Sequence, residues 1–301
     1  MKLTQKLLIT FTVCVEIAAT NAKAQNLPPN FGTPQGTDAL AASAGFLDIL
    51  EIKLGMPAEA ALATLKKNYP ASRITLERTP DYESAWYTVE RENPSHKWVH
   101  QIDVDPVSFG DKITIGLSLP PSKQVVHSIA RDTYFKEPVA IENIVAALRK
   151  KYGQETYGVD YRMSSVAPFD GSAKQLLWIY DARGNRVKPD ALTKNATVCS
   201  NSSTADSGAS QIHVAGSRPY EPSTLNSTPC WSLVILRAVI QTESPVPGIA
   251  GQTRGFSVAA WDWPLITSGA NALYAFLDQG ARDLAAKQAA DAKKRGGDVK
   301  Y

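Results

Sequence analysis

The stretch "VAALRKKYG" (Val145–Gly153) repeats the pattern of "LATLKKNYP" (Leu62–Pro70), which lies 83 residues earlier in the chain. Each stretch carries a leucine, a run of charged or polar residues and a tyrosine, and each ends in a helix breaker. Apolar residues at helical spacing lead into both stretches. The pattern therefore predicts two equivalent amphipathic helices, one ending at Pro70 and the other at Gly153.

Segments in which apolar and polar residues alternate follow each predicted helix, and this pattern is typical of half-buried β-strands. After the first helix these segments are 72–79, 85–92, 97–105, 112–119 and 124–135. After the second helix they are 155–163, 175–181, 231–243 and 255–264. The order of elements, a helix and then a run of strands, thus occurs twice.

The fold class that this order predicts is α+β, with a tandem duplication. We expect two antiparallel sheets, each covered by a helix, because the connections are too short for parallel crossovers. The first unit covers residues 46–137 and the second covers residues 138–301. A long C-terminal helix is predicted from Ile266 to Gly297, with its first half packed on the second sheet and its last turns in solvent.

The N-terminus has the pattern of a secretory signal peptide. Lys2 and Lys6 precede an apolar stretch, Leu7–Ala19, and Ala22-Lys23-Ala24 fits a cleavage site for small residues. An uncleaved membrane anchor is the other interpretation, but the apolar stretch is shorter than the ~20 residues that span a bilayer. We expect a signal peptide at 1–24, a flexible leader at 25–45, no transmembrane segment in the mature chain, and a periplasmic or secreted protein.

The net charge argues against a nucleic-acid-binding protein. The formal charge of the full chain is +3, and three lysines and one glutamate of the signal account for most of it. A mature chain that is nearly neutral lacks the basic surface that phosphate backbones attract.

Two cysteines remain after the signal, Cys199 and Cys230. In an exported chain an even pair predicts a disulfide. It would close the base of a polar insertion at 189–229, a loop of about 32 residues that the chain-entropy model values at roughly 3–4 kcal/mol. Metal binding by this pair lacks support, since only His213 lies between the two cysteines.

No catalytic residue, cofactor or metal is predicted. "GFSVA" (Gly255–Ala259) lacks the second glycine of a nucleophile elbow and lies in a predicted strand. His96 and His100 give two imidazoles, whereas a zinc site needs three or four ligands, so we interpret them as surface histidines. Glycine-rich phosphate loops are absent from the sequence.

The aromatic cluster "WDWP" (Trp261–Pro264) is the candidate binding feature. Trp261 and Trp263 are expected on one face of a strand. If exposed, they would suit a peptide or glycan contact. If buried, they are core under the final helix, and we give the same core interpretation to Trp86, Trp98 and Trp178.

The segment "IKLGMPAEAALATL" (Ile52–Leu65) resembles the opening of small bacterial envelope proteins of the BamE/SmpA type. In that family a Gly-Met turn starts a helix that packs on a short antiparallel sheet. The resemblance implies that Gly55 and Met56 form this turn and that Leu62 and Leu65 face the sheet. It also implies a scaffolding or protein-contact role in the cell envelope.

These observations favour an exported bacterial protein that acts as a non-enzymatic binding or scaffold module, with an envelope protein as its expected partner. Two alternatives stay open at this point. One is a hydrolase that acts on an envelope polymer through scattered carboxylates, and the other is a small-ligand binder or inhibitor.

Overall fold

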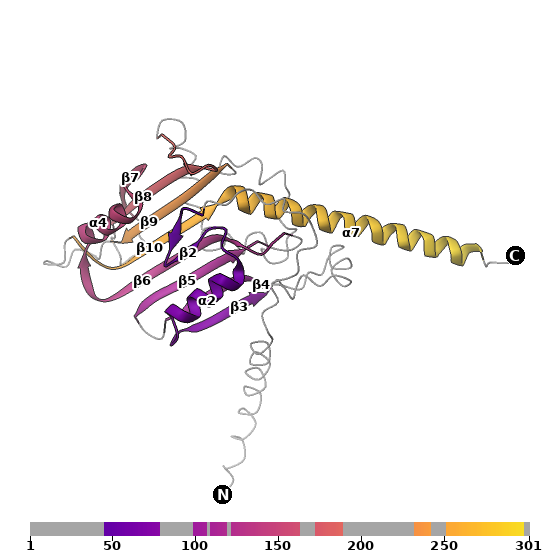
Figure 1. Ribbon diagram of the computed structural model, residues 1–301, viewed down its shortest axis with the longest axis horizontal. Coiled ribbons are helices and arrows are strands. Elements are labelled where there is room, and N and C mark those ends of the chain that lie inside the picture. Colours follow the sequence, from indigo (N-terminus) through magenta and orange to yellow (C-terminus); the bar gives the residue numbers. More distant parts are fainter. Residues whose placement is uncertain are drawn as a thin grey trace, which may run out of the picture.

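The computed structural model describes residues 45–78, 99–106, 109–118, 122–162, 172–188, 232–241 and 251–297. Within these residues the chain is α+β, with one large antiparallel sheet, a small hairpin and a long C-terminal helix (Figure 1). The fold class predicted from the alternating patterns is confirmed at this level.

The large sheet has eight strands, in the order β3-β4-β5-β6-β10-β9-β8-β7. Helix α2 (Ala58–Asn68) precedes β3 (Arg73–Arg78), β4 (Val99–Asp105), β5 (Gly110–Leu117) and β6 (Val126–Ala140). Helix α4 (Ile141–Tyr152) precedes β7 (Tyr157–Arg162), β8 (Ser172–Asp181), β9 (Leu233–Gln241) and β10 (Gln252–Asp262). The element order therefore repeats, and the two sets of four strands mirror each other across the β6–β10 boundary.

Two antiparallel sheets are present, as predicted, but their sizes differ from the prediction, because one has eight strands and the other has two. Strands β6 and β10 pair antiparallel from Gln252 opposite Ala140 to Trp261 opposite Ser128, which fuses the two sets into one sheet. The physical reason is that both are long strands whose backbone groups would otherwise lie at open edges. The second sheet is only the hairpin of β1 (Asp48–Ile49) and β2 (Ile52–Lys53).

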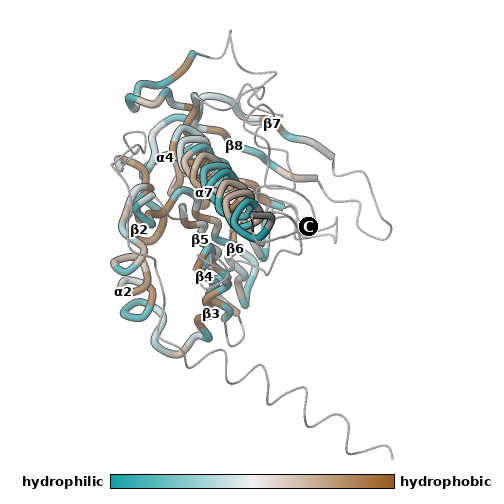
Figure 2. Tube along the Cα trace, turned by 90° about the vertical axis from the view of Figure 1, so that its right-hand side faces the viewer, coloured by the Kyte–Doolittle hydropathy of each residue, from teal (hydrophilic) through white to brown (hydrophobic). Residues whose placement is uncertain are grey.

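Helices α2 and α4 and the β1–β2 hairpin all cover the same face of the large sheet (Figure 2). Each helix turns its apolar residues into one shared core. These buried helix residues are Ala58, Ala61, Leu62 and Leu65 in α2, and Ile141, Ile144, Val145 and Leu148 in α4. Gly153 ends α4 with a φ of 76°, a left-handed conformation that glycine adopts without strain.

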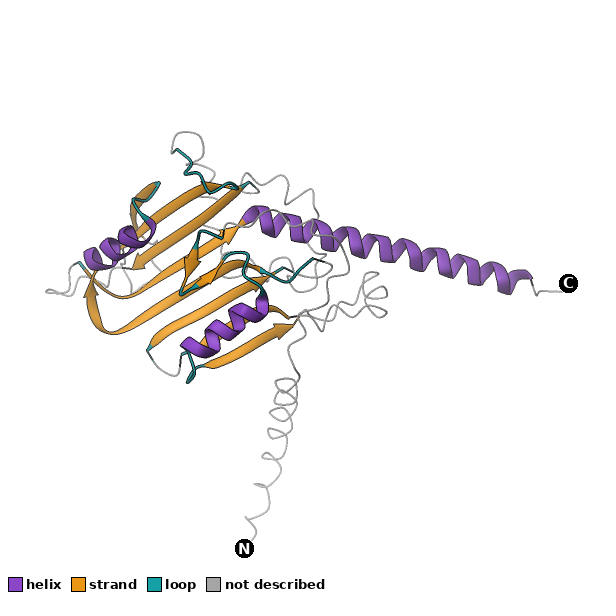
Figure 3. Cartoon of the chain, viewed as in Figure 1, coloured by secondary structure: helices purple, strands orange, loops and turns teal. Residues whose placement is uncertain are grey.

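Helix α7 (Trp263–Gly297) begins three residues earlier than predicted, because the Asp262 carboxylate caps it. Asp262 Oδ1 accepts a hydrogen bond of 3.0 Å from the backbone N–H of Leu265, which satisfies an otherwise unpaired helix donor. The first turns pack on the second face of the sheet against Trp261 and Ile235. The helix then runs away from the sheet (Figure 3), as its Ala-rich and charged composition predicts.

Several predictions lie outside the described residues. They are the signal peptide at 1–24, the leader at 25–44, the strand at 85–92, the insertion at 189–229, the Cys199–Cys230 disulfide, and the placement of Trp86, Trp98 and His96. The proposed unit boundary at 137/138 falls within the last residues of β6, and the two units remain a prediction.

Candidate binding groove

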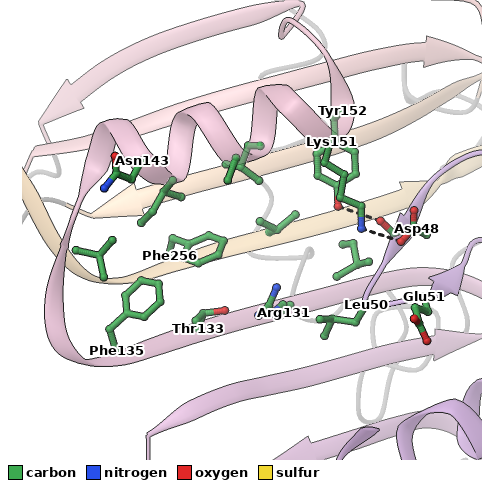
Figure 4. A pocket seen from close by; sticks show the side chains of 16 residues that line it. Asp48, Leu50, Glu51, Arg131, Thr133, Phe135, Asn143, Lys151, Tyr152 and Phe256 are labelled. Atoms are coloured by element: carbon green, nitrogen blue, oxygen red, sulfur yellow. Dashed lines mark hydrogen bonds and ion pairs between the residues drawn. The ribbon is translucent and has the colours of Figure 1, made fainter.

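A groove lies on the covered face of the sheet, between α4 and the β1–β2 hairpin (Figure 4). Its volume is ≈ 510 Å³. Strands β6 and β10 form the floor, α4 forms one wall and the hairpin forms the other. Lining residues such as Glu51, Asn143, Ala147 and Lys151 are exposed, so the groove is open to solvent.

Apolar side chains dominate the lining of the groove. Phe135 of β6 and Phe256 of β10 stack with ring centroids 5.8 Å apart, at the end of the groove where Asn143 lies (Figure 4). Ile144, Leu148 and Val258 continue the apolar surface toward the hairpin. Covering such a surface is favourable by roughly 25 cal/mol per Å², so the groove suits an apolar group.

Arg131 lies in the floor, and its charge is already matched. Its guanidinium donates to both oxygens of Asp111, at 2.9 and 3.0 Å, and stacks 5.9 Å from the centre of the Phe256 ring. Tyr69 and Thr133 also donate to Asp111, each at 2.8 Å. Burial works to raise the pKa of Asp111, but the hydrogen bonds from Arg131, Thr133 and Tyr69 hold it below its ordinary value.

Polar contacts tie α4 to the hairpin at the other end of the groove. Lys151 donates to Asp48 Oδ2 at 2.7 Å, and the Tyr152 hydroxyl donates to the Asp48 carbonyl oxygen at 2.9 Å. Burial raises the pKa of Tyr152 well above its ordinary value, so this phenol stays a donor. The Asp48 carboxylate of the hairpin is thus compensated by the Lys151 cation of α4.

The tip of the hairpin has an unusual backbone. Leu50 and Glu51 have φ values of 57° and 67°, in the left-handed region. A two-residue hairpin turn with two positive φ values normally uses Asn-Gly, and other residues cost about 1–2 kcal/mol each. Conflicts between local preference and structure cluster at functional sites. Both residues line the groove (Figure 4), which makes the tip part of the candidate site.

The predicted binding residues lie elsewhere. Trp261 is 1 % exposed, within the apolar cluster under the start of α7, and Trp263 is half-buried against the same cluster. The two therefore share one side of the sheet, although Trp263 already belongs to α7. Their binding role remains a prediction, but a ligand would reach Trp261 only if its neighbours moved, among them Arg237, whose guanidinium lies 5.5 Å from the centre of the Trp261 ring. Trp178 is fully buried, as its core interpretation predicts.

His100 is not a surface residue, contrary to the prediction. It is 6 % exposed, in the part of β4 where the pairing with β3 shifts register between Val99 and Gln101. Burial lowers its pKa to about 4, and burial together with the nearby His100 lowers the pKa of His127 to about 4. In the described part of the chain no three His, Cys, Asp or Glu side chains converge as metal ligands.

Signs of catalysis are sparse in the described residues. The groove lining there contains no His, Cys or Ser. Ser257 lies in the middle of β10 and donates to Asp132, and a strand interior is not the strand-to-helix turn of a nucleophile elbow. These observations leave the groove as the strongest site.

Sequence reasoning missed the groove because its walls come together only in three dimensions. Asp48 and Lys151 are 103 positions apart, and Arg131 and Phe256 lie on strands that were assigned to separate sheets. The single local signal was Leu50-Glu51 between two short apolar segments, at positions where a tight turn favours Asn or Gly.

Comparisons with protein-family models, with curated proteins and with solved structures gave no match. None of the helices in the described ranges combines the length and hydropathy that a bilayer crossing requires.

Proposed function

We propose that this protein is an exported, non-enzymatic binding module and that the groove between α4 and the β1–β2 hairpin is its binding site. The observation that carries the proposal is an open apolar groove of ≈ 510 Å³ whose cations are already paired with carboxylates. Pockets of roughly this size, with apolar walls and a few polar groups, are typical of ligand sites.

The hydrolase interpretation has less support. Glycoside hydrolysis places two carboxyl groups on either side of the scissile bond. Asp48 and Glu51 both line the groove, but they belong to one hairpin at one end of it, and Asp48 is paired with Lys151 (Figure 4). The positions of Asp48 and Glu51 therefore favour ligand binding over hydrolysis as the function of the groove.

A titration with Nile red, a neutral apolar dye, tests the site. The variant Ala147→Trp fills the groove from α4, and Ala146→Trp is a matched control on the next exposed position, outside the groove. We expect Ala147→Trp to weaken dye binding at least tenfold and Ala146→Trp to leave it unchanged. Equal binding by the wild type and Ala147→Trp would contradict the proposal.

The proposal includes an ancestral duplication and a relation to proteins of the BamE/SmpA type. The repeated order of a helix and four strands, and the mirrored strand order, support the duplication. Gly55 has a φ of 79° directly before α2, and Leu62 and Leu65 are buried toward the sheet. This local geometry supports, for the stretch Ile52–Leu65, the turn and the helix packed on a sheet that the BamE/SmpA-type resemblance implies.

Export rests on the N-terminal pattern and has its own test. We expect the protein purified from the periplasm of an expressing bacterium to begin at Gln25, with Cys199 and Cys230 protected from thiol reagents until reduction. Intact-mass and N-terminal analysis would show this. A full-length chain retained in the cytoplasm would contradict export.

A further inference from the structure

We infer, on the basis of the proposed binding function, that the groove takes an extended peptide segment in which a bulky apolar side chain stands next to a lysine or arginine. The apolar side chain enters between α4 and the hairpin, and the cation pairs with Glu51. Three observations on the groove lead to this ligand class.

The first observation is the charge balance of the groove. Arg131 is paired with Asp111, and Lys151 is paired with Asp48. Glu51 also lines the groove, and the described part of the chain offers it no ion-pair partner. The charge left for a ligand to complement is therefore negative, and a cation is the complementary group.

The second observation is the position of the Glu51 carboxylate. Glu51 and Leu50 occupy two consecutive left-handed positions at the hairpin tip, where the backbone favours Asn and Gly. The strained backbone at the hairpin tip thus places the apolar Leu50 and the carboxylate of Glu51 at adjacent positions of the groove wall. A partner segment with an apolar residue beside a basic one complements this pair residue by residue.

The third observation is the openness of the groove. Asn143, Ala147 and Lys151 are exposed along the α4 wall, so this side of the groove is open to solvent and leaves room for a longer chain to continue past it. Small-molecule sites usually bury most of the ligand surface, whereas peptide grooves receive anchor side chains from a longer chain. The Asn143 amide lies at the aromatic end (Figure 4), where it can bond a peptide backbone.

Displacement of Nile red from the full-length protein by three matched peptides tests the inference. The peptides are acetyl-Gly-Phe-Leu-Lys-Gly-amide and the same sequence with Gln or Glu in place of Lys. Exposed charge pairs are weak, so we expect the Lys peptide to bind about three- to fivefold more tightly than the Glu peptide at low salt. This preference should disappear at about 1 M salt, where the Debye length is about 3 Å.

Charge variants assign the preference to Glu51. We expect Glu51→Gln to abolish it and Glu51→Lys to reverse it in favour of the Glu peptide. Glu59→Lys, an equal charge change on the exposed surface of α2, is the matched control and should leave the preference unchanged. The readout is a ratio of affinities within one variant, so it does not depend on equal folding yields.

Failure of the two proposals would look different. Equal displacement by all three peptides, or an unchanged ratio in Glu51→Lys, overturns the ligand class while groove binding stands. Displacement by dodecylamine but by none of the peptides overturns the peptide in favour of a small amphiphilic amine. Absence of Nile red binding to the wild type overturns the binding function and this inference together.

Discussion

The ends of α2 and α4 follow the same sequence pattern but face different surroundings. The Tyr69 hydroxyl, after α2, donates at 2.8 Å to the Asp111 carboxylate, which Arg131 and Thr133 also bind. The Tyr152 hydroxyl, at the end of α4, donates at 2.9 Å to a backbone carbonyl of the β1–β2 hairpin. One tyrosine joins a carboxylate network of the sheet, and the other holds a hairpin that borders an open groove.

The difference between the two helix ends indicates which side of the fold carries the proposed binding site. The repeated pattern sets two equivalent helices, but the hairpin occurs only before the first helix and packs against the second. The α4 side consequently has two walls, and the floor between them stays open. The following variants test whether the α2 side is tightly packed structure and the α4 side is a binding site.

The largest expected effect comes from truncating the last core leucine of each helix. Leu65 is 0 % exposed, whereas Leu148 is 7 % exposed and lines the groove. We expect Leu65→Ala to lower the free energy of unfolding by about 3–5 kcal/mol and Leu148→Ala by about 2 kcal/mol, because a cavity beside an open groove adds little. Urea unfolding of both variants measures this. Equal losses would contradict the contrast.

The next effect is a dependence of stability on pH that arises in the first four strands. His100 and His127 titrate near 6.5 when unfolded and at about 4 when folded, so the unfolded chain binds more protons between these values. The contribution of the two histidines to the free energy of unfolding is therefore fully present above pH 6.5 and is lost as the pH falls toward 4. We expect a loss of about 2 kcal/mol per histidine from pH 7 to pH 5.

The measurement is the free energy of unfolding in urea at pH 7, 6 and 5. The charge of Asp103 works to raise the pKa of His100 and burial to lower it, and the value of about 4 includes both effects. A His127→Gln variant should lose about half of the pH dependence. A wild-type profile that is flat from pH 7 to pH 5 would show that these imidazoles are not held neutral.

A third pair of variants compares the carboxylates that the two tyrosine regions use. Asp111→Asn removes the acceptor charge of a partly buried network, and we expect a loss of about 2 kcal/mol in the free energy of unfolding. Asp48→Asn should cost under about 1 kcal/mol, because Asp48 and Lys151 are 32 % and 43 % exposed. Thermal unfolding at low and high salt measures both. A larger loss for Asp48→Asn would reverse the assignment of the rigid and open sides.

The smallest effect concerns the hairpin tip. Glu51 has a φ of 67°, so Glu51→Gly should stabilise the fold by about 0.5–1 kcal/mol by relieving the left-handed backbone. Glu59→Gly within α2 should instead destabilise it by about 1 kcal/mol. Urea midpoints of the two variants give the comparison. A stabilised Glu51→Gly that also loses the preference for basic peptides would indicate that strain is retained for binding.

The sequence predicted the features that depend on neighbouring residues in the chain, and it did not predict those that depend on contacts between distant segments. Both amphipathic helices and the strands within the described ranges follow local periodicity, and they lie within a few residues of the expected positions. Joining β6 to β10 was missed, because strand alternation identifies a strand but not its neighbour. His100 was predicted on the surface but is buried, because alternation along a strand does not show which residues other elements cover.

The residues of the groove could not be predicted from local sequence either. Trp261 and Trp263 stood out in the sequence because aromatic residues are conspicuous, yet Trp261 is buried under α7. Phe135 and Phe256 form the aromatic floor, although nothing in their local sequence distinguishes them from core residues. Their role follows only from the pairing of β6 with β10 and from the hairpin that stops short of covering them.

Hydrogen exchange of the full-length chain, with and without the lysine peptide, tests the central claim most directly. If the groove is the binding site, the peptide should slow amide exchange in 47–54 and 141–152 and leave 58–68 in α2 unchanged. Protection centred on α2 or on α7, with the peptide bound, would contradict the account.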